Sequence, residues 1–202
     1  MTQALTTIPS TESWAVMREQ AFVLLKSGFL PASVKTPEQA IAIAELGREL
    51  DIPPMQAFRQ IAVIQGKPTI SPELMLALAF RGIKGFGISW KQSDEVAAVL
   101  VVTRPGSQPF EASFTIEEAR EAGLAGKESW RKYPAAMLRA RAIAIAGRAY
   151  WPDALNGFSY TAEELGAEVQ ELDSEFGIVS VGQPTPAPVG ETAPTKAAST
   201  GV

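Results

Sequence analysis

Clustered cations and aromatic rings between Lys127 and Trp151 could bind a single-stranded nucleic acid. The stretch Lys127–Arg148 holds six basic residues and one acid, a local charge of +5 in a chain whose net charge is −4. Cations of this kind bind phosphates, and flat rings beside them can stack on bases. The basic residues are Lys127, Arg131, Lys132, Arg139, Arg141 and Arg148, and the aromatic residues are Trp130, Tyr133, Tyr150 and Trp151.

Helical spacing would bring two of these arginines together. Pro134 suits the first turn of a helix, which would continue to about Trp151 before Pro152. Arg141 and Arg148 are seven positions apart, so they would lie within about 20° of each other around the helix axis. The alternative interpretation is a solvated surface helix with scattered arginines, because charge runs are commonly just surface.

Three blocks of the sequence resemble the phage single-strand annealing recombinases of the RecT and Red-beta type. The first block runs from Trp130 through Pro134, Met137–Ala142 and Arg148 to Tyr150, the second covers 50–61 and the third covers 65–75. The resemblance spans roughly 36–165 and implies a Rad52-like annealing fold in which a long helix lines a DNA groove. It implies DNA contacts at Arg141 and Arg148, and at Arg59 on the first strand of a hairpin. The family commonly has a basic residue just after the helix proline, where this chain has Ala135.

The remaining candidate DNA contacts have ordinary alternatives. Lys67 is a candidate cation at the tip of the hairpin, or an ordinary exposed strand residue. Trp130 and Tyr133 could stack on bases, although packing under the helix is favoured for Trp130 because large aromatics at helix entries usually anchor them. Arg131, Lys132 and Arg139 complete the predicted set, whereas Tyr150 and Trp151 resemble core or subunit-interface residues.

Composition excludes several kinds of chemistry. The chain of 202 residues has no cysteine and no histidine. Disulfides and thiolate metal sites are therefore absent, as are the commonest general base and the His-assisted nucleophiles. No run approaches the length of a membrane span, and the start lacks the features of a signal peptide, so we expect a cytoplasmic protein of a bacterial host cell with no membrane partner.

Charge is divided unevenly along the chain. Residues 1–152 carry a net charge of +3, whereas residues 153–202 carry one lysine and eight acids, a net charge of −7. The sequence pI of about 5.0 therefore conceals a mildly basic body, which weakens the objection to nucleic-acid binding.

The pattern of apolar residues and turns predicts one α+β domain over 1–176. We expect helices at 11–27, from Pro37, from Pro72 to about Phe80 and from Pro134. A hairpin is expected at 59–70, with Arg59–Gln65 as its first strand, and a three-strand antiparallel meander follows around 86–90, 96–103 and 110–114. Thr115 and Glu118 form a capping-box pattern. Residues 163–175 could form a short helix, and 177–202 are predicted to be a disordered tail rich in Pro, Thr and Ala.

Together with these features, the resemblance implies ATP-independent binding of single-stranded DNA and annealing of complementary strands in phage-type recombination, by a non-enzymatic protein that needs no cofactor. Neither Gly66-Lys67 nor the glycines at 82–87 fit a nucleotide-binding motif. The expected partners are single-stranded DNA, the annealed duplex intermediate and further copies of the chain in a ring or helical filament. The family adds a companion exonuclease and the host single-strand binding protein.

Two other functions remain open at this point. One is a single-strand binding protein that does not anneal. The other is a carboxylate-metal nuclease that would use Glu117, Glu118 and Glu121, or a second acidic cluster at Glu163, Glu164 and Glu168. Capping of helix starts is the more ordinary role for both clusters.

Overall fold

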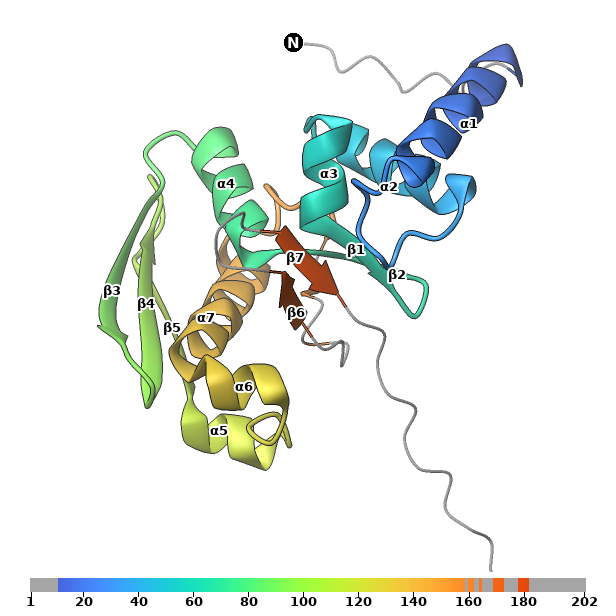
Figure 1. Ribbon diagram of the computed structural model, residues 1–202. Helices are drawn as coiled ribbons and strands as arrows, with labels where there is room; N and C mark the ends of the chain where they lie inside the picture. Colours follow the sequence, from blue (N-terminus) through green and yellow to red (C-terminus); the bar gives the residue numbers. More distant parts are fainter. Residues whose placement is uncertain (1–10, 159, 162–163, 165–168, 173–177, 182–202) are drawn as a thin grey trace, which may run out of the picture.

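The computed structural model of the chain describes residues 11–158, 160–161, 164, 169–172 and 178–181. The fold is mixed α+β, as the sequence predicts, with helices around small antiparallel sheets (Figure 1). The helices are α1 (Thr11–Lys26), α2 (Pro37–Glu49), α3 (Pro54–Gln60), α4 (Pro72–Gly82), α5 (Ile116–Glu121), α6 (Glu128–Lys132) and α7 (Pro134–Tyr150). The strands are β1 (Ile61–Ile64), β2 (Lys67–Ile70), β3 (Gly87–Ser93), β4 (Ala97–Thr103), β5 (Phe110–Thr115), β6 (Val169–Leu172) and β7 (Ile178–Val181).

Local sequence signals set several helix starts. Thr36 and Thr115 each form a complete capping box, with Gln39 and Glu118 as the reciprocal partners. Ser71 caps α4 by accepting a hydrogen bond from the amide of Leu74. Prolines occupy the first turn of α2, α3, α4 and α7, where their missing N–H has no intrahelical partner to lose.

The first hairpin pairs β1 with β2 through a two-residue turn. Gln65 and Gly66 have φ values of 51° and 76°, as the type I′ turn favoured between right-twisted strands requires. The hairpin itself is as predicted, but its first strand is shorter. Arg59 was expected on that strand and instead lies in the last turn of α3. Pro53 and Pro54, which predict a break after α2, also start this short helix, because proline is favoured at a first helical turn.

The second sheet is the predicted antiparallel meander in the order β3-β4-β5. Leu100, Val102, Ala112 and Phe114 form part of its apolar inner face and are buried. Helix α7 packs across this face, in contact with β4 and β5 (Figure 1). The long basic helix therefore covers the sheet, which fixes which of its side chains remain near the surface.

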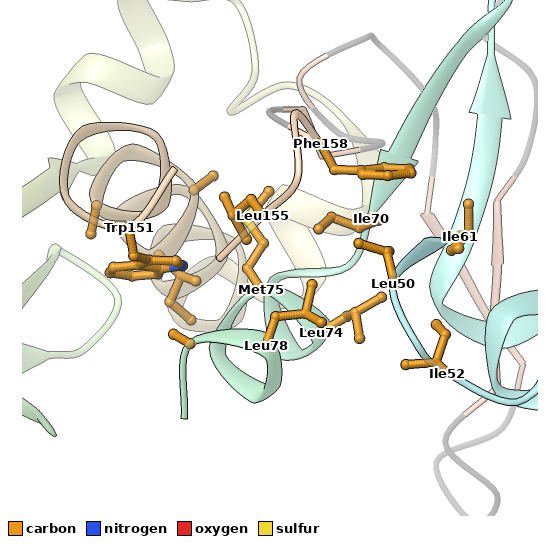
Figure 2. Packing of buried hydrophobic residues seen from close by; sticks show 14 of the residues in the cluster. Leu50, Ile52, Ile61, Ile70, Leu74, Met75, Leu78, Trp151, Leu155 and Phe158 are labelled. Carbon is orange, nitrogen blue, oxygen red and sulfur yellow. The ribbon is translucent and has the colours of Figure 1, made fainter. Parts of the chain in front are cut away.

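A continuous core joins the sheet and α7 to the N-terminal helices. Figure 2 shows Leu50, Ile70 and Leu74 beside Leu155 and Phe158, which follow α7 in the sequence. Trp151 is fully buried and meets Phe86 edge-on, with the ring centroids 5.2 Å apart. The chain after α7 thus returns to the first hairpin.

The C-terminal region departs from the predicted organisation. Strands β6 and β7 pair antiparallel, and β7 contacts α3. A strand therefore occupies Val169–Leu172, where a short helix was considered, and another occupies Ile178–Val181, inside the predicted tail. Three of the four residues in 178–181 are β-branched, which suits a strand. Residues 182–202, the rest of the predicted tail, lie outside the described residues.

Among the helices that the structure describes, none is long and apolar enough to cross a membrane.

Candidate nucleic-acid interface

Arg141 lies where α7 meets the edge of the meander. Its neighbours Leu138 and Ala142 are fully buried against the core, while the Arg141 side chain retains 19% of its exposure. The guanidinium carbon lies 4.9 Å from the centroid of the Phe114 ring on β5, which is within the range of a cation–π contact. Phe114 therefore holds the arginine from the sheet side.

One carboxylate joins Arg141 to Arg148. Glu164 Oε1 accepts a hydrogen bond from Arg141 Nη1 at 2.5 Å, and Oε2 accepts one from Arg148 Nη1 at 2.6 Å. Helix geometry separates the two arginine Cα atoms by about 10 Å along the axis, so the long side chains converge on Glu164. The side chain of Glu164 is only 8% exposed, which makes this a half-buried charge cluster in which two cations share one anion.

Tyr160 and Thr161 link the position of this carboxylate to the first hairpin. The amide of Ile70 on β2 donates to the Tyr160 carbonyl at 3.1 Å. Thr161 is 1% exposed, and its amide donates to Glu164 Oε2 at 3.1 Å. Glu164 therefore receives a backbone hydrogen bond in addition to its two ion pairs.

Trp130 does not have the surface position that base stacking requires. It is 2% exposed and packs against Phe114, with the ring centroids 6.1 Å apart. The packing alternative is therefore correct for Trp130, and the stacking role is withdrawn. Because Phe114 contacts both Trp130 and Arg141, the tryptophan supports the ring on which Arg141 rests.

Three predicted contact residues gather at the junction between α6 and α7. Arg131, Lys132 and Tyr133 are all exposed. The Lys132 ammonium lies 5.2 Å from the centroid of the Tyr133 ring. This junction presents two cations and one accessible ring at the N-terminal end of α7.

The hairpin side of the molecule contributes Arg59 and Lys67, both of which are exposed. The Lys67 ammonium lies 5.5 Å from the ring centroid of Tyr160, so Lys67 meets the same segment that delivers Glu164 to α7. Arg139 is separate from the pair at Arg141 and Arg148, because its Nη1 lies 3.3 Å from the Ser93 hydroxyl at the end of β3.

Two acidic residues of α5 have structural roles. Glu118 completes the capping box at Thr115, and Glu117 forms an ion pair with Arg120. Within the described ranges, no group of three or more acidic side chains is placed to hold a metal ion. Glu163 and Glu168 of the second acidic cluster lie outside the described residues.

Arg104, which lies outside the predicted set of contacts, holds the C-terminal end of α7. Arg104 binds both carboxylate oxygens of Asp153, at 2.9 and 3.0 Å, and also donates to the Tyr150 carbonyl at 3.0 Å. These hydrogen bonds from Arg104 hold the pKa of Asp153 below its ordinary value of 3.8. The Tyr150 ring stacks on Phe110 with the centroids 5.5 Å apart, so Tyr150 serves the packing of α7 on β5.

Sequence reasoning finds the two arginines but not the residues that hold them. Phe114 is identified only as a strand residue, and Glu164 only as a member of an acidic cluster. The spacing Thr161-x-x-Glu164 matches a capping-box pattern, and that signal could have indicated the hydrogen bond between these two residues. Nothing local to the sequence pairs Glu164 with α7.

No known family model matches the chain, and a search of curated proteins finds no match either.

Proposed function

We propose that this protein binds single-stranded DNA and anneals complementary strands without ATP. The observation that carries the proposal is the convergence of Arg141 and Arg148 on one carboxylate. Two guanidinium groups that reach the same small anion are spaced to bind one phosphate together. Arginine is well suited to this task because its planar fork of donors matches the oxygens of a phosphate.

The surrounding cations would extend such a site along a strand. Lys67 on the hairpin contacts Tyr160, four residues before Glu164, and Arg131 and Lys132 lie at the end of α6, just before α7 begins. Contacts of this kind go to phosphates and carry no sequence information. This arrangement supports binding of any single strand, which an annealing protein requires.

The proposed mechanism is physical and involves no covalent step. The cations hold the backbone of one strand and leave its bases accessible to a complementary strand. Further copies of the chain, in a ring or a filament, would add weak contacts along the same strand, so that the summed affinity is high while each contact remains exchangeable. The Rad52-like architecture and membership of the annealing family are part of this proposal and come from the resemblance of the three sequence blocks.

An annealing assay tests the function directly. Two complementary labelled oligonucleotides are mixed with protein in the absence of nucleotide, and pairing is followed by fluorescence, with the product lengths read on a denaturing gel. We expect faster pairing and full-length strands. Binding without faster pairing would indicate a single-strand binding protein that does not anneal, and shortened strands that depend on magnesium would indicate a nuclease.

Removal of the two arginines tests the site. We expect Arg141→Ala and Arg148→Ala each to weaken binding of every single-stranded sequence. Each lost phosphate contact should also flatten the slope of log affinity against log salt by about 0.7. Arg120→Ala is the matched control, because Arg120 is an exposed arginine paired with Glu117 on α5. If both variants keep the affinity and the salt slope of the wild type, α7 does not carry the DNA site.

A further inference from the structure

We infer that Glu164 is an internal competitor for the phosphate site, and that the part of the chain carrying Tyr160, Thr161 and Glu164 is a gate that closes this site until DNA displaces it. The inference rests on the proposed function and adds its regulation. In this inference, Glu164 occupies the place between Arg141 and Arg148 that a DNA phosphate would take.

The contacts of Glu164 are those of a phosphate substitute. Its two oxygens bind the two arginines at 2.5 and 2.6 Å, and a backbone amide completes the set. Short hydrogen bonds between ionised groups are stronger than hydrogen bonds between neutral groups. While Glu164 holds them, neither arginine can offer the same donors to DNA.

The carboxylate does not use every donor of the site. Arg141 Nε is buried and has no hydrogen-bond partner among the described residues. A DNA phosphodiester presents two anionic oxygens, as many as the carboxylate, so it can take the place of Glu164 between the two arginines. Arg141 Nε is a donor that Glu164 leaves unused and that an incoming phosphate can bind, which favours displacement.

The hairpin gives DNA a second point of competition. Lys67 lies over the ring of Tyr160, and the Tyr160 carbonyl accepts from Ile70 on β2. A strand whose phosphate binds Lys67 would take that cation from Tyr160, one residue before Thr161. Binding at the hairpin therefore favours release of the segment that carries Glu164.

Neutralisation of the gate provides the principal test. Glu164→Gln keeps the size of the side chain and removes its charge. If the open state is about a tenth of the population in the wild type, the variant binds single strands about tenfold more tightly, because the apparent dissociation constant scales inversely with the competent fraction. Glu95→Gln, at an exposed position in the turn between β3 and β4, removes the same charge elsewhere and should leave the affinity unchanged.

The same substitution in the Arg141→Ala, Arg148→Ala background separates this inference from the function. The gain from Glu164→Gln should disappear there, because the competed donors are gone. If the arginine variants weaken binding but Glu164→Gln leaves it unchanged, the DNA site stands and the gate is wrong. If Glu164→Gln weakens binding, Glu164 orients the arginines and the gate is equally wrong. If wild type and all variants fail to bind, the proposed function itself fails, and the gate fails with it.

A measurement on the unmodified protein guards against a misfolded variant. The Thr161 amide donates to Glu164, so its hydrogen exchange reports on closure. Addition of a single-stranded oligonucleotide should accelerate exchange at Thr161 while the amides of α7 remain protected. Slower exchange at Thr161 with bound DNA would overturn the gate, because the segment would then stay closed in the complex.

Discussion

At the scale of single residues, the site consists of Arg141, Arg148 and Glu164. The spacing of the two arginines in the sequence predicts that they lie together, whereas no sequence spacing predicts that Glu164 lies between them. The seven-residue interval places Arg141 and Arg148 on one side of a helix, and both reach one carboxylate. Glu164 follows them by 23 and 16 positions. Its position depends on the tertiary path of the chain after α7, and that path is set by the burial of Leu155 and Phe158 rather than by any local pattern.

The contact between Arg104 and Asp153 leads to a prediction about stability at acidic pH. The pKa of Asp153 is lowered by its hydrogen bonds from Arg104, so the folded state favours the ionised carboxylate more than the unfolded state does. This contribution is present above the ordinary pKa of 3.8 and is lost as the pH falls below it through the folded value. We expect Asp153→Asn to lower the thermal stability at neutral pH and to reduce its loss on acidification. Melting curves from pH 6 to pH 2 measure this, and parallel curves for the two proteins would contradict it.

At the scale of elements, capping and proline signals predict the starts of four helices but do not predict the short helices α3 and α6. The starts of α2, α4, α5 and α7 follow from Thr36, Ser71, Thr115 and Pro134. Helices α3 and α6 have seven and five residues, too few for a hydrophobic period to establish itself, so their stability depends on packing. The misplacement of Arg59 on a strand follows from this, because the helix that contains it has only a short local signal.

The close packing of α3 against α2 predicts that a larger residue at their contact destabilises the protein. A Cβ added to Gly47 on α2 would lie 2.5 Å from Ala57 Cβ on α3. Gly47→Ala should therefore destabilise the protein by about 1–3 kcal/mol through overpacking, partly offset by the better helix propensity of alanine. Chemical denaturation measures the change.

Gly82→Ala is the matched control for that substitution. A Cβ at Gly82 would meet Ala154 Cβ at 3.7 Å, an ordinary contact distance. We expect its free energy of unfolding to stay within about 0.5 kcal/mol of the wild type. Equal stabilities for Gly47→Ala and the wild type would mean that α2 and α3 separate without cost.

At the scale of the whole molecule, the sequence predicts the composition of the layers but not their arrangement. The alternation in β3 and β5 and the apolar run in β4 predict a meander with one buried face, and the structure contains it. Packing between distant segments decides which helix covers that face. It also brings Leu155, Phe158 and Tyr160 back to the first hairpin. The acidic charge after residue 152 is likewise visible in the sequence, whereas its contact with α7 is not.

The C-terminal strands set the position at which the chain can be shortened. We expect a chain that ends at Val181 to bind and anneal bare oligonucleotides as the full chain does, with a melting temperature within about 2 °C of it. A chain that ends at Gly177 loses β7, which pairs with β6 and contacts α3, and should melt at a lower temperature. Loss of bare-strand annealing on removal of 182–202 would place part of the active surface in that range.

A partner assay completes this prediction. Annealing is repeated on strands coated with the host single-strand binding protein, with the full chain and with the chain that ends at Val181. We expect removal of the tail to slow annealing only on the coated strands. Equal rates on coated strands would argue against a partner site in residues 182–202.

The return of the chain to the first hairpin has a consequence for biosynthesis. Leu155 and Phe158 pack beside Leu50 and Ile70 (Figure 2), and the Asn156 side chain donates to the Glu49 carbonyl at 3.3 Å. The ribosome therefore releases α2, the hairpin and α4 well before the residues that complete their core. During that interval the nascent chain exposes apolar surface, which is the condition that recruits chaperones and promotes aggregation.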